Sequence, residues 1–397
     1  IAGARARLGR LALGPALVVG QVALSTLLLI GAGLLLHSTQ RILTVDLGFD
    51  RDHIVIADVP MHQRSLSGAG VLAAAREMAD GMQRVPGVRA VTYSEEGLFS
   101  GGESTGHVVV PGFTAVADSQ MGINYDVVGP NYVHAIGARL IRGRDLDERD
   151  VPGAEHTALV DETMARFYFG TGNPVGRSFA LDSTTYTIAG VVHDVQEQDV
   201  RDLPVRRAYL PVAQMAAAPK WLYFEVRVAG DPAQFVQPVR ASLLERHPDL
   251  RNVVKPLDAM VRETIGQDLL LTRVTSFFGA AALLLAAVGL YGITAYSTSQ
   301  RTGEFGLRSA LGATPRNVSS MVLGEAVRLA ACGVAIGLPA GLAATRLIRS
   351  QVFGVGSLDA VSIGAAIIAL TVTALLASYL PARRAARVGP LEALRSE

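Results

Sequence analysis

The sequence has 397 residues, of which 50% are apolar and 18% are charged, and its mean hydropathy is +0.33. This balance excludes both an ordinary soluble domain and a protein lying wholly in a bilayer, so we expect membrane and water-exposed parts in one chain. The net charge of +1 gives no bulk attraction to nucleic acid, and the single cysteine, Cys332, excludes an intrachain disulfide. The chain begins at Ile1 rather than Met and shows no cleavable signal, which is typical of a fragment or a processed form.

Four apolar runs predict membrane-spanning helices. Residues 11–36 carry no charge, and these 26 residues exceed the roughly 20 that a spanning helix needs. The third run contains Pro339 and reaches a spanning length only if it starts near Val318. Glu325 and Arg328 then lie in its first turns, where a charge costs less than at the bilayer centre. The predicted spans are residues 11–37, 274–300, 318–345 and 360–382.

Arginine residues flank these runs unevenly. By the positive-inside rule, their distribution predicts cytoplasmic locations for residues 1–10, 301–316 and 383–397. Residues 38–273 then lie outside, and residues 346–359 form a short external loop. The arginines of the cytoplasmic segments are Arg5, Arg7, Arg10, Arg301, Arg308, Arg316, Arg383, Arg384, Arg387 and Arg395, whereas the external loop has only Arg346 and Arg349.

The large outer segment has the patterning of a mixed α/β domain. Residues 84–91 (RVPGVRAV) resemble residues 246–253 (RHPDLRNV), and each stretch follows an apparent strand and helix. This weak repeat suggests two βαβ-like halves, with chance similarity as the alternative. The expected strands are residues 53–61, 88–94, 107–110, 122–128, 185–195 and 221–228, and the expected helices are residues 69–85 and 232–247.

The charged segment between the second and third spans has the pattern of a short amphipathic helix. Glu304 and Arg308 are spaced i,i+4 with the acid first, which supports a helix. Leu307 and Leu311 share one face, with Phe305 beside them. Gly312 is expected to stop this helix, and Thr314-Pro315 is expected to cap and begin the next one. The alternative is a connecting loop with basic anchors.

Glycines recur in the third span. Gly333, Gly337 and Gly341 follow a G-x-x-x-G-x-x-x-G pattern, which lets another helix approach closely. We expect these residues to form a helix-packing face. Because four spans offer little buried surface, we expect the partner of this face to be a second permease half.

Motifs for catalysis are weak. Neither a G-x-x-x-x-G-K-[ST] loop nor an H-E-x-x-H motif is present, and the glycine-rich residues 170–176 miss the dinucleotide fingerprint. Residues 102–106 fit G-x-S-x-G, but they lie between a loop and a strand, whereas the nucleophile elbow needs a strand before it and a helix after it. His193 and Asp194 lack a third metal ligand nearby. We therefore predict no catalytic, cofactor-binding or metal-binding residue. The alternative is a membrane-anchored hydrolase using Ser104, which would lose its activity in a Ser104→Ala variant.

Two cytoplasmic motifs resemble those of one membrane-protein family. Residues 301–313 (RTGEFGLRSALGA) match R-x-x-E-h-G-h-R-x-A-L-G-A, where h is hydrophobic, and residues 381–390 (PARRAARVGP) match P-A-R-R-A-x-R-x-x-P. These are motifs of the MacB/FtsX-type permeases of ABC transporters. Gly389 stands where the family commonly has Asp. Weaker outer cues are residues 136–137, 142–144, 173–176 and 190–195, and residues 31–36 with 48–50 resemble the second half of long duplicated permeases.

The resemblance implies an α-helical membrane protein with four transmembrane helices and a large α/β extracytoplasmic domain between helices 1 and 2. It implies a location in the bacterial inner membrane and no ATP hydrolysis by this chain. The expected partners are a separate ABC ATPase, a second permease half (another copy or a fused half) and a periplasmic adaptor. By resemblance, the ATPase docks on the segment that contains Arg301, Glu304, Phe305, Leu307, Arg308, Leu311 and Gly312.

Two functions fit this architecture. The first is a transport permease that couples ATP hydrolysis to motion of the outer domain, for export or extrusion. The alternative is a non-transporting transmitter that regulates a periplasmic enzyme or a signalling partner. The sequence does not identify the cargo.

Overall fold

The computed structural model describes residues 2–61, 68–201, 204–217, 219–248, 250, 252–347 and 359–387. The chain divides into two compact units. Residues 1–44 and 267–397 form a helical unit, and residues 45–266 form an outer α/β unit. Arg349 and Arg395, which are predicted to lie in the external loop and in the cytoplasmic tail, are outside the described residues.

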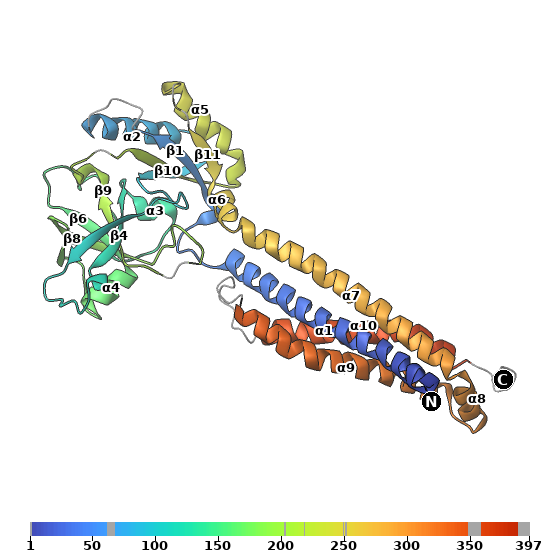
Figure 1. The fold of residues 1–397 in the computed structure, drawn as a ribbon. Helices are drawn as coiled ribbons and strands as arrows, with labels where there is room; N and C mark the ends of the chain where they lie inside the picture. The colour runs from blue at the N-terminus through green and yellow to red at the C-terminus, as the bar shows by residue number, and fades with distance from the viewer. Residues whose placement is uncertain are drawn as a thin grey trace. The chain divides into compact units, whose positions relative to one another are not determined.

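Long helices build the helical unit (Figure 1). They are α1 (Ala2–Thr44), α7 (Gly266–Gln300), α9 (Pro315–Leu347) and α10 (Ala360–Ala385), with the short α8 (Thr302–Ala310) between α7 and α9. Within the described residues, four helices are long and apolar enough to cross a membrane, which confirms the four predicted spans. Helix α7 begins eight residues before residue 274, because a helix can continue into water beyond its apolar run, whereas hydropathy marks only the run.

Alanine, valine and leucine side chains fill the centre of the bundle. Val18 and Val22 of α1 meet Ala286 and Leu290 of α7 and Ala330 of α9, and Leu370 and Ala374 of α10 complete this cluster. Ser25 Oγ donates a hydrogen bond to the Ala282 carbonyl of α7 at 2.9 Å, while it also bonds within its own helix. Such interhelical bonds stabilise helix pairs in a medium that offers no water.

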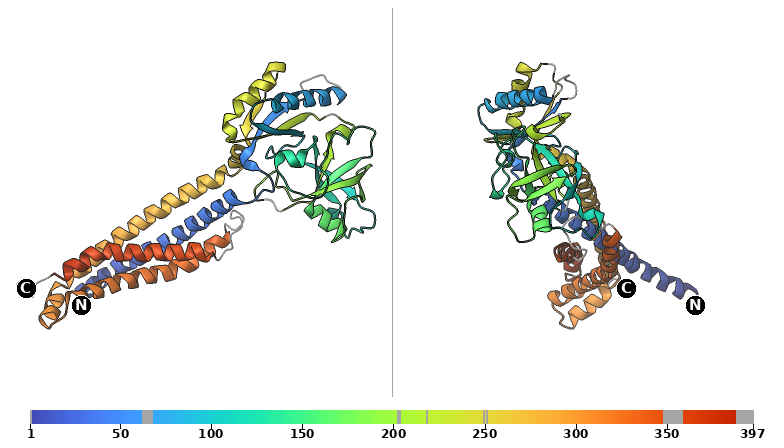
Figure 2. Two further views of the ribbon diagram at one scale, coloured as in Figure 1. Left: turned by 180° about the vertical axis from the view of Figure 1, so that it is seen from behind. Right: turned by 90° about the vertical axis from the view of Figure 1, so that its left-hand side faces the viewer.

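Two lobes make up the outer unit, which is shown from two further directions in Figure 2. The first lobe has the strand order β11-β1-β10-β2, with antiparallel neighbours throughout. Helices α2 and α5 connect β1 to β2 and β10 to β11, so two β-α-β units interlock in one sheet. The two βαβ-like halves suggested by the repeat are therefore present. The elements are β1 (Ile54–Pro60), α2 (Gly68–Gln83), β2 (Val88–Ser94), β10 (Trp221–Val228), α5 (Val236–Arg246) and β11 (Val253–Pro256).

Side chains alternate across this first sheet. Val55, Ala57 and Val59 of β1 are buried with Phe224 and Val226 of β10 against α2 and α5. The intervening residues of each strand therefore point to the opposite face. That opposite face carries polar side chains, among them Asp58 of β1 and Tyr223 and Glu225 of β10.

The second lobe lies between β2 and β10 in the sequence. Strand β4 joins it to the first lobe through one register pair, Ser94↔Val128, and also pairs in parallel with β9. Its core is formed by residues such as Ile123, Val160, Phe179 and Leu210. The elements are β3 (Ser104–Val109), β4 (Gly122–Val128), α3 (Tyr132–Ile136), β5 (Leu140–Gly143), β6 (Thr157–Asp161), α4 (Glu162–Phe169), β7 (Ser178–Leu181), β8 (Thr184–Val192) and β9 (Arg207–Pro211). Helix α6 (Leu257–Thr264) follows β11 and ends the outer unit.

Candidate functional site

The segment between α7 and α9 is a helical corner, as its sequence predicts. Helix α8 ends at Ala310, and Gly312 adopts φ +97°, a left-handed conformation that suits glycine at a helix C-terminus. The Ala313 amide donates to the Arg308 carbonyl at 2.9 Å. The Thr314 hydroxyl then accepts a long hydrogen bond from the Asn317 amide at 3.4 Å, and α9 begins at Pro315.

The inner face of α8 holds the helix against the bundle. The Phe305 side chain is only 3% exposed and packs with Val318 and Val322 of α9 and with Ala382 and Ala385 of α10. The sequence groups Phe305 with the residues that dock a partner. The structure instead turns its ring inward, because the helical spacing places position 305 on the side opposite the exposed leucines. Phe305 anchors α8 and offers no surface to a partner.

The outer face of α8 is apolar at its end and charged along its side. Leu307 is 62% exposed, and Leu311, which directly follows the helix, is 81% exposed. Beside them, Arg308 forms an ion pair with Glu304 at 2.6 Å. This pair is solvent-exposed, so it contributes little to stability and leaves both charges at the surface beside the leucines.

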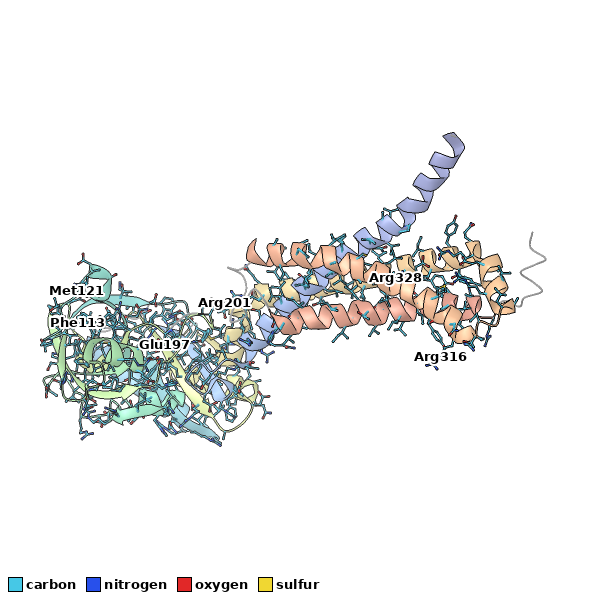
Figure 3. All side chains as sticks on the ribbon, turned by 90° about the horizontal axis from the view of Figure 1, so that it is seen from below. Phe113, Met121, Glu197, Arg201, Arg316 and Arg328 are labelled. Carbon is cyan, nitrogen blue, oxygen red and sulfur yellow. The ribbon has the colours of Figure 1, made fainter. Side chains whose placement is uncertain are left out.

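Glu325 has a role at this corner that the sequence did not predict. Its carboxylate pairs at 3.1 Å with Arg301, the residue that follows α7, and so links the end of α7 to α9. A cavity of about 960 Å³ lies beside this pair, lined by residues of α1, α7 and α9. Figure 3 marks Arg316 and Arg328, which lie on α9 on either side of this region. Glu325 was detectable only as a charge inside a predicted span.

The glycines of α9 pack against α1 of the same chain. A Cβ atom at Gly333 would lie 2.6 Å from Val22 Cβ, and one at Gly337 would lie 2.4 Å from the Ala23 carbonyl oxygen. At Gly341 the nearest atom would be Ile30 Cδ1 at 3.1 Å. These positions therefore permit a close approach of two helices. The expectation that this face receives a second permease half is wrong, because α1 already covers it.

The residues of the weak catalytic motifs make contacts within the outer unit. Ser104 opens β3, and its hydroxyl hydrogen-bonds to the Glu96 carboxylate. Asp194 accepts hydrogen bonds from the amide and hydroxyl of Thr163 at the start of α4, at 2.8 and 2.7 Å. His193 contacts Glu162 at 3.2 Å. Among the described residues, no group of three His, Cys, Asp or Glu side chains could hold a metal ion.

A buried polar cluster joins the two lobes, and sequence reasoning missed it. Glu225 of β10 is fully buried and accepts a hydrogen bond from Ser94 at 2.6 Å. Burial raises the pKa of Glu225 to about 8, against the opposing effect of the Ser94 hydrogen bond. Burial also raises the pKa of Asp126 on β4. Glu197, marked in Figure 3, forms a buried ion pair with Arg207. The alternation of side chains along β10 predicts that Glu225 points away from α2 and α5. It does not predict which residues cover Glu225 on the other face of the sheet.

The fold and the corner together define a multi-pass membrane protein with a large α/β domain between its first two spans. The family model for the MacB-like periplasmic core domain matches residues 16–242, and the model for the FtsX-like permease C-terminal region matches residues 276–390. The chain therefore belongs to the MacB/FtsX family of permeases. It is an inner-membrane protein whose outer unit is periplasmic.

Curated relatives are similar over about two thirds of this chain. The macrolide export ATP-binding/permease protein MacB of Burkholderia cenocepacia (strain HI2424) is 27% identical over 67% of this chain and 40% of its own length. MacB of Bdellovibrio bacteriovorus is 28% identical over 68% of this chain and 43% of its own length. The chain thus spans less than half the length of these relatives. The solved periplasmic region of MacB from Actinobacillus actinomycetemcomitans aligns with a TM-score of 0.39 and 17% identity, covering 57% of this chain and 98% of that one.

Proposed function

We propose that this chain is the permease of an ABC exporter and that a separate ATPase subunit docks on α8. The observation that carries the proposal is that α8 has one face buried against the bundle and another face exposed to solvent. Phe305 is buried against α9 and α10, while Leu307 and Leu311 are exposed beside the Glu304–Arg308 ion pair. An exposed apolar pair with a charged rim on a rigidly held helix is the pattern of a protein-binding surface.

Docking on α8 would reach both of the last two helices. The Phe305 ring touches side chains of α9 and of α10, so a displacement of α8 cannot leave these helices unaffected. In this proposal, ATP hydrolysis moves the bundle, and the bundle transmits that motion to the periplasmic unit. Relatives of this chain are named ATP-binding/permease proteins, which supports a partnership of the two activities.

The proposal includes two further partners. An ATPase dimer needs two docking corners, so we propose a second permease half, supplied by another copy or by a fused homologous half. Because α1 covers the glycine face of α9, that half has to use another face of the bundle. A periplasmic adaptor would bind the outer unit.

The test truncates the two exposed leucines and leaves Phe305, which anchors α8, unchanged. Leu307→Ala combined with Leu311→Ala is expected to weaken ATPase binding about thirtyfold, since a truncated interface hot spot costs about 2 kcal/mol. Glu304→Arg should have a similar effect, because it places a like charge beside Arg308. Co-purification of the ATPase and stimulation of its activity are measured in membranes with equal amounts of each variant.

A matched control uses two leucines that are equally exposed but lie on spans. Leu284→Ala combined with Leu376→Ala truncates side chains that are each 69% exposed, on α7 and α10. This control should bind and stimulate the ATPase like the parent. Should the α8 variants do the same, α8 is a passive connector and the docking proposal fails. A non-transporting transmitter would also need this docking surface, so the experiment tests the coupling between the ATPase and the permease.

A further inference from the structure

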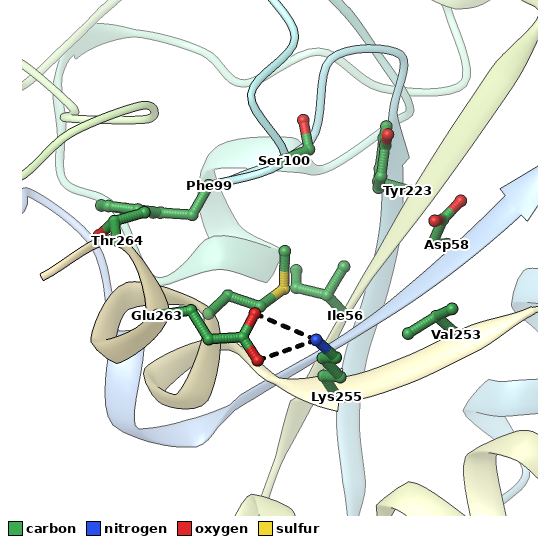
Figure 4. Close-up of a pocket in the computed structure, with 10 residues that line it drawn as sticks. Ile56, Asp58, Phe99, Ser100, Tyr223, Val253, Lys255, Glu263 and Thr264 are labelled. Carbon is green, nitrogen blue, oxygen red and sulfur yellow. Dashed lines mark hydrogen bonds and ion pairs between the residues drawn. The ribbon is translucent and has the colours of Figure 1, made fainter. Parts of the chain in front are cut away.

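A cavity of about 470 Å³ lies in the first lobe of the outer unit (Figure 4). Its floor is the sheet face opposite α2 and α5, where alternation places Ile56 and Asp58 of β1, Tyr223 of β10 and Lys255 of β11. Helix α6 forms one wall, with Met260 and Glu263 among its contributions. The loop after β2 forms another wall. The volume falls within the roughly 300–1,000 Å³ that small-molecule sites occupy.

The loop wall is held in an unfavourable backbone conformation. Phe99 has φ +56°, which is a rare value for a bulky residue, and its neighbours Gly97 and Gly101 also have positive φ values. The Phe99 amide donates to the Glu197 carbonyl at 2.6 Å, and its ring is 6% exposed and packs edge-on against Phe49. Strained residues of this kind concentrate at ligand-binding sites. Here the strain places an aromatic side chain on the cavity.

The charges of the cavity do not balance. Lys255 Nζ binds both carboxylate oxygens of Glu263, at 2.9 and 3.1 Å (Figure 4). No described residue supplies such a cation to Asp58. Among the described residues, its carboxylate accepts a hydrogen bond only from Trp221 Nε1. Burial raises the pKa of Asp58, against the opposing effect of that hydrogen bond. Within the described part of the chain, no ion pair therefore neutralises the Asp58 carboxylate.

These features together specify a ligand class. The carboxylate of Asp58 attracts a cation. Phe99 and Tyr223 supply aromatic rings, whose faces attract an ammonium group, and Ile56 and Met260 offer apolar contact. We propose that this cavity binds a small organic ammonium ion with an apolar body. The site is separate from α8, so this inference stands or falls independently of the docking proposal.

The chain carries its own reporter for this test. Trp221 is the sole tryptophan of the sequence, and it donates to Asp58. The full chain in phosphatidylcholine nanodiscs is titrated with three probes that share one body: 4-phenylbutylamine, 4-phenylbutanol and 4-phenylbutyrate. The dissociation constants follow from the change in Trp221 fluorescence. The amine is expected to bind about tenfold more tightly than the alcohol, as one charge-assisted hydrogen bond allows, and the acid more weakly than either.

Two variants move the result in opposite directions. Asp58→Asn keeps an acceptor for Trp221 but removes the charge, so it should abolish the preference for the amine while the alcohol still binds. Lys255→Met frees the Glu263 carboxylate and should tighten amine binding several-fold. Asp118→Asn changes an exposed aspartate outside the cavity and should behave like the parent. Equal affinity for amine and alcohol in the parent, or an amine preference that persists in Asp58→Asn, would overturn the proposal.

Discussion

Replacing Gly337 by valine should loosen the contact between α1 and α9. A Cβ atom at this position would lie 2.4 Å from the Ala23 carbonyl oxygen and 2.7 Å from Thr26 Cβ. The first of these atoms belongs to the backbone, so it cannot move aside as a flexible side chain would. The two helices have to separate, which also disturbs the contact at Gly333, one turn away.

The magnitude follows from two opposing effects. Overpacking a tight contact costs about 1–3 kcal/mol. Valine gains only a few tenths of a kcal/mol over glycine in helix propensity. We therefore expect a net loss of about 1–2.5 kcal/mol in the free energy of unfolding of the helical unit.

A matched substitution lies in the same helix. At Gly324 a Cβ atom would meet nothing within 4 Å, so Gly324→Val should be close to neutral. The assay is unfolding of the purified protein in graded amounts of SDS, followed by far-ultraviolet circular dichroism. If Gly337→Val and Gly324→Val unfold at the same SDS fraction, the close packing of α1 on α9 is refuted.

Three further predictions concern the outer unit and the topology. The pKa of Glu225 is about 8 when folded and 4.5 in the reference state, so its contribution to stability is complete below pH 4.5 and is lost as the pH rises through 8. The melting temperature of the outer unit should therefore fall between pH 5 and about pH 8, and Glu225→Gln should flatten that fall. Arg207→Met leaves the buried Glu197 carboxylate unpaired and should cost about 3–5 kcal/mol, measured by urea unfolding, and adding Glu197→Gln should recover much of it. In a cysteine-free background, Val116→Cys (91% exposed in the parent) should react with an impermeant maleimide added from the periplasmic side. Leu311→Cys should react only after the inner membrane is opened. Labelling of Leu311→Cys in sealed spheroplasts would contradict a cytoplasmic location of α8.

Sequence patterns predicted the elements whose signal is local. Strands β4 and β10 have the predicted bounds, because each alternates or carries β-branched and aromatic residues over seven or eight positions. Strands β6 and β9 were missed. They have five residues each and are buried almost throughout, so they show no alternation that separates a strand from a buried loop or helix.

Properties that depend on a neighbour were not predictable in the same way. The glycine spacing indicated a close helix contact, but whether the partner was α1 or another chain depends on tertiary packing. The same limit applies to Phe305, whose inward orientation depends on Val318 and Ala382 approaching from two other helices. The cavity around Asp58 combines three strands, a loop and α6, which are distant in the sequence. No local pattern records such a combination.

The pairing of β1 with β11 has a mechanical consequence. The chain enters the outer unit through β1, soon after α1, and leaves it through β11 and α6, just before α7. These two strands run antiparallel, and Val55 at the start of β1 pairs with Pro256 at the end of β11. A force that pulls the start of β1 away from the end of β11 therefore acts on one end of the strand pair and breaks its hydrogen bonds one after another. A force along the strands would instead act on all of these hydrogen bonds together. Because only four register pairs join β1 to β11, this pairing offers little resistance to such a peeling force. The sheet can therefore open at this edge while β1 stays paired with β10 on its other side.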